Sequence, residues 1–135
     1  MHRILYISTA RTLLSADELS RLLAAAQRSN AAKGITGMLV VGGRRFLQAL
    51  EGERDVVKMT FDRIARDPRH MGIVTLGDTP IASRSFAQWS MGFESGGDGG
   101  AARSLEDQVA AIVAPIEDAT LRAYFTGFAH RHSAA

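Results

Sequence analysis

Residues 36–52 of the chain read TGMLVVGGRRFLQALEG, and this stretch decides the fold. Its two halves, 36–41 and 45–51, are short, largely apolar runs of the length that β-strands have in globular proteins. Between them lies Gly42-Gly43, and a glycine pair favours a tight hairpin because glycine accepts positive φ without strain. The stretch therefore predicts two antiparallel strands that pair within a sheet.

A strand and a helix are expected before this hairpin. Residues 2–8 are rich in Ile, Leu and Tyr, which indicates a first strand. A helix then begins with a capping box formed by Ser15 and Glu18, and Gly34 is suited to end it. The apolar residues of this helix recur on one face, at Leu19, Leu22, Leu23 and Ala26. We therefore expect the helix to pack that face on the sheet.

The segments after the hairpin repeat the helix and strand patterns. A second helix is expected over residues 54–66, and Pro68 prevents its continuation. Residues 73–76 and 90–93 then predict a fourth and a fifth strand. The order β-α-β-β-α-β-β predicts an α+β fold, a ferredoxin-like sheet with two helices packed on one face. This fold serves many functions and does not identify one by itself.

The chain continues with a linker and two further helical patterns. Residues 96–100 read GGDGG, so we expect a linker over 95–103 between a domain of residues 1–94 and a helical extension of residues 104–135. Each helical pattern has an apolar stripe, formed by Leu105, Val109, Ile112 and Val113 in the first and by Leu121, Tyr124, Phe125 and Phe128 in the second. These stripes must be covered either by this domain or by a neighbouring chain.

The composition excludes several classes of site. The chain has no cysteine, which rules out disulfides, a thiol nucleophile and thiolate metal ligands, and agrees with a reducing compartment. Its net charge is only +2 with the basic residues scattered, and it has no apolar run of membrane-spanning length. We therefore expect a cytoplasmic protein that binds neither nucleic acid nor membrane.

The sequence around the other candidate motifs does not support a catalytic, dinucleotide-binding or metal site. Residues 97–102 resemble a dinucleotide-binding turn, but no strand follows the next helix to complete a βαβ unit. His130 and His132 are two apart on a helix and do not face one another, so we expect no metal site. Nothing around Ser8 resembles a nucleophile elbow. No enzyme site follows from these motifs.

Three polar residues interrupt otherwise apolar segments. Gln48 lies within the third strand, Tyr6 within the first, and Asn30 near the end of the first helix. Each has an ordinary explanation, as an edge amide, a half-buried aromatic and a helix cap. In a ferredoxin-like sheet, however, the first and third strands are central neighbours, so Tyr6 and Gln48 can point at each other. Together the three residues predict a pocket between the helices for a flat heterocycle that carries both donors and acceptors.

Several separate motifs share the order and spacing of one known family. They are Tyr6-Ile7-Ser8, Asn30 with Gly34-Ile35-Thr36-Gly37, FLQALEG at 46–52, DPRH at 67–70 and WSMGF at 89–93. On these motifs the sequence resembles the BLUF family, sensors of blue light that use FAD, over about residues 4–93. Ser29 and Val41 depart from the family pattern, where asparagine and an aromatic residue are common, which bears on cofactor tuning rather than on photochemistry.

The resemblance implies a flavin, FAD or FMN, held between the two helices. Tyr6 would be the light-driven electron donor, Gln48 would bridge it to the flavin, and Asn30 would hold the pyrimidine edge of the ring. The ring would be sandwiched by Leu22, Phe46 and Ile64. The ribityl chain and phosphate would be met by Asp67, Arg69 and His70. The pocket would be coupled to the fifth strand by Trp89 and Met91.

The resemblance also implies a photoreceptor without enzymatic activity. A light-driven rearrangement of the Tyr–Gln–flavin hydrogen bonds would pass to a downstream protein, or through a homo-oligomer formed by the C-terminal helices. Two alternatives remain open. One is a light-insensitive ferredoxin-like module that binds a ligand or only assembles. The other is a small enzyme of the acylphosphatase type, for which residues 8–11, without a glycine, make a poor phosphate-binding loop.

Overall fold

The computed structural model describes residues 1–87, 92–95 and 105–132 of the chain. The elements in chain order are β1 (His2–Ala10), α1 (Ala16–Lys33), β2 (Thr36–Gly42), β3 (Arg45–Gly52), α2 (Arg54–Ala65), β4 (His70–Pro80), β5 (Gly92–Ser95), α3 (Leu105–Val113) and α4 (Ala119–His132). This order confirms the predicted β-α-β-β-α-β-β arrangement followed by two helices. None of the helices in the described part of the chain is long and apolar enough to cross a lipid bilayer.

The strands form one sheet in the order β4-β1-β3-β2-β5. β2 and β3 pair antiparallel as the predicted hairpin, β1 pairs antiparallel with both β3 and β4, and β5 joins β2 in parallel. In the β1–β3 ladder, Tyr6 lies opposite Gln48. The sheet therefore has the predicted ferredoxin-like topology, and its two central strands bring together the two residues that the sequence analysis singled out.

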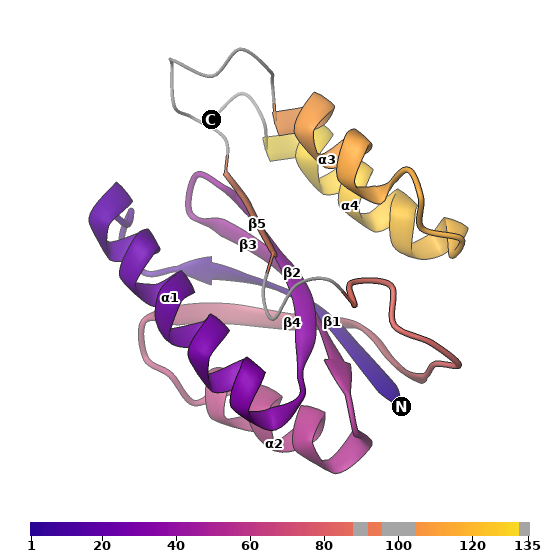
Figure 1. The fold of residues 1–135 in the computed structure, drawn as a ribbon. Helices are drawn as coiled ribbons and strands as arrows, with labels where there is room; N and C mark the ends of the chain where they lie inside the picture. Colours follow the sequence, from indigo (N-terminus) through magenta and orange to yellow (C-terminus); the bar gives the residue numbers. More distant parts are fainter. Residues whose placement is uncertain (88–91, 96–104, 133–135) are drawn as a thin grey trace.

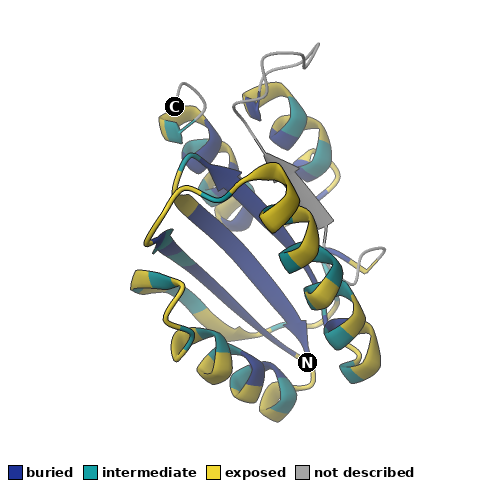
Figure 2. Cartoon of the chain, turned by 90° about the vertical axis from the view of Figure 1, so that its left-hand side faces the viewer, coloured by how far each residue is buried: buried dark blue, intermediate teal, exposed yellow. Residues whose placement is uncertain are grey.

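Helices cover both faces of the sheet (Figure 1). α1 and α2 lie on one face, which we call the first face, and α3 and α4 lie on the other, the second face. The core of the first face includes Ile4, Tyr6, Leu39, Leu50 and Val57. The core of the second face includes Leu5, Leu47, Phe86, Val109 and Phe125. Figure 2 shows the central strands buried between these layers, with the exposed residues on the outer sides of the helices.

The caps of α1 are those that the sequence predicts. The Ser15 side chain accepts a hydrogen bond from the Glu18 amide at 3.1 Å, and the Glu18 carboxylate accepts one from the Ser15 amide at 2.9 Å. Gly34 ends the helix in the left-handed conformation, with φ of 70°. This cap fixes the last turn of α1, where the predicted site residue Asn30 lies.

β1, β2 and β3 extend one or two residues beyond the predictions, and β4 and β5 differ more. β4 runs from His70 to Pro80, well beyond the predicted residues 73–76, because it pairs with β1 along its whole length despite two register shifts. It lies at the edge of the sheet, where its side chains do not alternate regularly between buried and exposed, so the sequence has a strand signal only in the middle. β5 covers Gly92–Ser95 rather than 90–93. Residues 90 and 91 lie outside the described residues.

The C-terminal apolar stripes are covered by the chain itself. Leu105, Val109 and Val113 of α3 and Leu121, Phe125 and Phe128 of α4 are buried in the core of the second face. α4 reaches the β2–β3 hairpin, where His132 packs directly against Gly42. Of the two possibilities that the sequence left open, the structure shows coverage by this domain.

Candidate functional site

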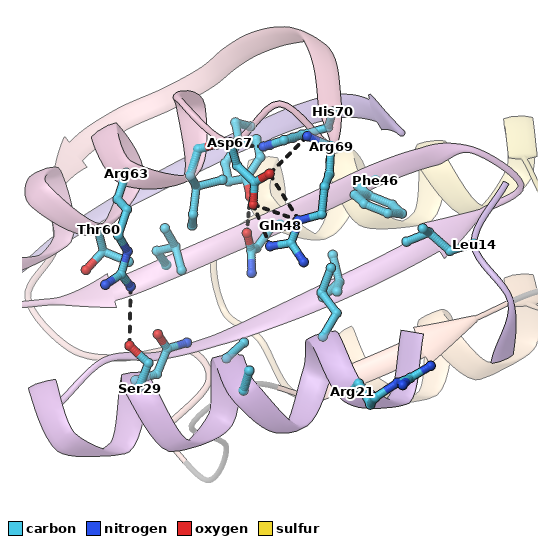
Figure 3. A pocket seen from close by; sticks show the side chains of 18 of the residues that line it. Leu14, Arg21, Ser29, Phe46, Gln48, Thr60, Arg63, Asp67, Arg69 and His70 are labelled. Carbon is cyan, nitrogen blue, oxygen red and sulfur yellow. Dashed lines mark hydrogen bonds and ion pairs between the residues drawn. The ribbon is translucent and has the colours of Figure 1, made fainter. Parts of the chain in front are cut away.

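A cavity of about 730 Å³ opens between α1 and α2 over the first face of the sheet (Figure 3). It is lined by Tyr6, Leu14, Glu18, Arg21, Leu22, Ala25, Ala26, Ser29, Asn30, Leu39, Phe46, Gln48, Leu50, Thr60, Arg63, Ile64, Asp67, Arg69 and His70. All of the predicted flavin-binding residues are among them. Trp89 and Met91, the predicted coupling residues, lie outside the described residues.

Tyr6 and Gln48 form a hydrogen-bonded pair in the floor of the cavity. The Tyr6 hydroxyl donates to Oε1 of Gln48 across the β1–β3 ladder. Both side chains are buried, and the ring of Phe61 packs edge-on against that of Tyr6 at 5.2 Å between centroids. Burial raises the pKa of Tyr6 above its ordinary value. The phenol is therefore neutral at physiological pH and is held in one orientation as a donor.

Asn30 enters the cavity from the last turn of α1. Its side chain is buried, and its backbone carbonyl accepts a hydrogen bond from the Ile35 amide at 2.9 Å, as part of the helix cap. The neighbouring Ser29 hydroxyl accepts from Arg63 of α2 at 3.3 Å, so a polar contact bridges the two helices at this end (Figure 3). The cap and the bridge together fix the spacing of α1 and α2 beside Asn30.

The loop from α2 to β4 and the start of β4 also line the cavity, through Asp67, Arg69 and His70. Arg69 Nε donates to both carboxylate oxygens of Asp67, at 3.0 and 2.9 Å. The hydrogen bond from the Arg69 side chain lowers the pKa of Asp67, so this carboxylate stays ionised. His70 Nε2 lies 2.6 Å from the Ile64 carbonyl and must donate to it, because a carbonyl only accepts. In the neutral imidazole, Nδ1 of His70 is then an acceptor, and it has no partner within the described chain.

The walls of the cavity are apolar. Leu22 from α1, Phe46 from β3 and Ile64 from α2 provide them, as the sequence predicts. Thr60 also lines the cavity, with a buried hydroxyl that has no partner within the described chain. The sequence analysis missed Thr60, although it lies one helical turn before Ile64 and therefore shares its face of α2. A buried hydroxyl without a partner is available to hydrogen-bond a molecule that enters the cavity.

The lining suits a flavin. The volume lies within the range of pockets that enclose drug-sized ligands, roughly 300–1,000 Å³. Apolar walls match the two faces of a flat ring, while the amide of Gln48, the hydroxyl of Thr60 and Nδ1 of His70 offer groups for its polar edges and side chain. Among the described residues, no group of three or more His, Asp or Glu side chains could hold a metal ion. Fold and site thus define a small domain with a cavity between two helices whose lining suits a flat heterocyclic ligand.

Comparison with known proteins identifies the family of this domain. A family model for BLUF, sensors of blue-light using FAD, matches residues 1–92. Photoactivated adenylate cyclase subunit beta from Euglena gracilis is 32% identical over 114 residues, which are 84% of this chain and 12% of that protein. The blue light- and temperature-regulated antirepressor BluF from Escherichia coli (strain K12) is 33% identical over 88 residues, 65% of this chain and 22% of that protein.

Solved structures show the same fold. BlrP1 from Klebsiella pneumoniae has a TM-score of 0.79 at 25% identity, over 96% of this chain and 32% of that one. The dark-state structure of BlrB, a BLUF protein, has a TM-score of 0.72 at 24% identity and covers 96% of both chains. The fold class predicted from the sequence, an α+β fold with helices packed on the sheet, is thereby confirmed.

The chain belongs to the BLUF family, and it is a blue-light sensor that binds a flavin, FAD or FMN. The prediction of a sensor rather than an enzyme is confirmed, because the family that matches is a sensor family. The chain spans only 12% of the length of the cyclase subunits and 22% of the antirepressor. What those whole proteins do is therefore not assigned to this chain.

Proposed function

We propose that Tyr6 and Gln48 form the photoactive pair of this chain and that the residues lining the cavity hold the flavin. The observation that carries the proposal is the hydrogen bond from the Tyr6 hydroxyl to the Gln48 amide oxygen in the floor of the cavity. Leu22, Phe46 and Ile64 would pack on the ring. Asn30, Asp67, Arg69 and His70 would meet its polar edge, side chain and phosphate. Trp89 and Met91 stay predicted coupling residues.

The pair is suited to a reversible switch. A bound flavin supplies the absorption of blue light and the redox chemistry that light starts. The buried phenol of Tyr6 is neutral and has one proton to donate, and it directs that proton at the amide oxygen of Gln48. An amide has acceptor and donor ends, so its rotation or tautomerism replaces one set of hydrogen bonds by another. Because each hydrogen bond contributes only about 1 kcal/mol net, the rearranged state reverts in the dark.

Absorption spectroscopy tests this function directly. The purified protein should show a flavin spectrum that shifts slightly to the red under blue light and returns in the dark. Tyr6→Phe and Gln48→Leu should each keep the flavin and lose the shift, because each removes one partner of the switch. Tyr124→Phe is the matched control, since Tyr124 lies on α4 outside the cavity. A normal shift in the Tyr6 or Gln48 variant would remove that residue from the mechanism.

We further propose that residues 1–94 form the light-sensing domain and that residues 95–103 link it to the helices of residues 104–135. These helices would carry the output, and the protein would act in the cytoplasm. The output would reach a downstream protein partner, or a second copy of the chain through the outer surface of these helices. Support comes from α3 and α4, whose inner faces share a core with the sheet and whose outer faces are exposed. Light scattering coupled to size-exclusion chromatography, in the dark and in blue light, tests the self-association. A single monomeric mass at high concentration in both conditions would exclude self-association and leave a downstream protein partner as the route of the output.

A further inference from the structure

Glu51 is a charged side chain buried inside the second face of the sheet. Its relative exposure is 0%, and it lies outside the cavity described above. Oε2 accepts a hydrogen bond from the Ser85 amide at 2.8 Å, and Oε1 accepts from the Phe86 amide at 2.9 Å and from the Thr36 hydroxyl at 3.3 Å. Burial of a carboxylate is costly unless such partners replace water. The hydrogen bonds of Glu51 therefore hold the turn that follows β4 against the end of β3.

Arg3 continues this contact to the helical layer. It faces Glu51 across the β1–β3 ladder, with Nη1 3.9 Å from Oε2 of Glu51. Its Nη2 donates to Oδ2 of Asp118 at 2.8 Å. The other oxygen of Asp118, Oδ1, accepts from the Leu121 amide at 3.0 Å and caps the start of α4. One chain of polar contacts thus runs from β3 through β1 to the first turn of α4.

This chain of contacts lies on the same two strands as the photoactive pair. Tyr6 pairs with Gln48, and Arg3 pairs with Glu51, in one continuous β1–β3 register. The first pair faces the cavity, and the second pair faces α3 and α4. A displacement of β3 relative to β1 at Gln48 therefore also changes the position of Glu51 relative to Arg3. Because the guanidinium hydrogen bonds are directional, Asp118 and the first turn of α4 would follow.

We propose that Glu51 is a positioning residue of the light response and that the Arg3–Asp118 ion pair transmits the change at Gln48 to α4. The inference rests on the proposed function, since it needs the rearrangement of the Tyr6–Gln48 pair. That pair is the two-state element, and the Glu51–Arg3–Asp118 contacts link it to the helical layer. The cavity and the flavin contacts are not part of this link.

The Asp118→Asn variant tests whether Asp118 transmits the light response to α4 while the fold is kept. Asparagine caps a helix about as well as aspartate, so the start of α4 is kept while the charge that Arg3 binds is lost. The readout is hydrogen–deuterium exchange of the α4 amides, in the dark and in blue light, on the flavin-loaded protein. We expect an unchanged red shift of the flavin, and a light-minus-dark difference in exchange rate over α4 that is reduced about threefold or more. Glu117→Gln is the control, because it removes the same charge one residue earlier and leaves the Arg3 pair intact.

Glu51→Gln provides the second variant. The Ser85 and Phe86 backbone amides donate to different oxygens of Glu51, and the amide nitrogen that replaces one of these oxygens in the variant cannot accept. The same loss over α4 is therefore expected, with the flavin shift retained. A full light-dark difference over α4 in Asp118→Asn, or the same reduction in Glu117→Gln, would overturn the inference. So would a wild-type protein that photoconverts normally without any change over α4. An absent flavin shift in the wild type would instead refute the proposed function, and the inference with it.

Discussion

Replacement of Gly42 by alanine tests the packing of α4 against the β2–β3 hairpin. A Cβ at this position would lie 2.5 Å from Cβ of His132 and 2.9 Å from its carbonyl oxygen. The first distance is about 0.9 Å short of the 3.4 Å at which ordinary van der Waals contact begins, and the obstacle includes backbone, so α4 must move. Overpacking of this kind costs about 1–3 kcal/mol, while the loss of glycine flexibility in the unfolded chain returns about 0.4–1 kcal/mol. We expect Gly42→Ala to lower the free energy of unfolding by about 1–2 kcal/mol.

Urea denaturation of the flavin-loaded protein, followed by far-ultraviolet circular dichroism, measures this change. Gly77→Ala is the matched control, because a Cβ there meets only Cβ of Leu5, at 3.8 Å, which is ordinary contact. In a His132→Gly background, the cost of Gly42→Ala should fall by about half or more, since the nearer obstacle is gone. Equal stabilities of Gly42→Ala and Gly77→Ala would show that the end of α4 does not rest on the hairpin, and the reasoning would fail.

Two further predictions concern the cavity. Thr60→Val removes a buried hydroxyl that has no partner within the described chain, so the stability of the flavin-free protein should be unchanged or higher. The same variant should bind flavin about fivefold more weakly in a fluorescence titration. An unchanged affinity would show that the hydroxyl does not contact the flavin. Because burial raises the pKa of Tyr6, the folded protein keeps the phenol proton at a pH where the unfolded chain loses it, and the free energy of unfolding should fall as the pH rises above about 10. Tyr6→Phe should show a smaller decline over the same alkaline range, and an identical decline would assign the effect to other groups.

The sheet could be predicted because its signals are local. The glycine pair at 42–43, the Ser15–Glu18 capping box and the Gly34 end of α1 each require only neighbouring residues, and the hairpin and both caps form as expected. Within the hairpin, Gly42 is the last residue of β2, and Gly43, with φ of 60°, begins the turn. The length of β4 could not be predicted, because it depends on pairing with β1 and not on the periodicity of its own sequence. Boundaries set by a partner strand leave little signal in the strand itself.

The candidate site was predictable to the extent that its residues break a pattern. A glutamine in an apolar strand and an asparagine at a helix end required an explanation, and the family motifs supplied the remaining residues. Thr60 breaks no pattern, because a threonine on a helix is unremarkable until its hydroxyl proves buried and without a partner in the described chain. The partners of Glu51 are backbone amides that lie far along the chain, at Ser85 and Phe86. No local rule connects those positions.

The position of the C-terminal helices follows from the strands that they cover. Residues 37–41 and 46–50 are apolar almost without interruption, apart from Gln48, whereas a sheet with one face in water shows alternation between apolar and polar residues. The hairpin therefore already required a second cover, over Met38, Val40, Leu47 and Ala49. The sequence allowed that cover to come from α3 and α4 or from another chain, and the structure shows that it comes from the chain itself. The apolar stripes are thus used within one molecule, so they are not available to bind a second copy of the chain. Under the proposed function, self-association through these helices would use their outer surface, and a light signal that reaches a partner there would first move α3 or α4 on the sheet.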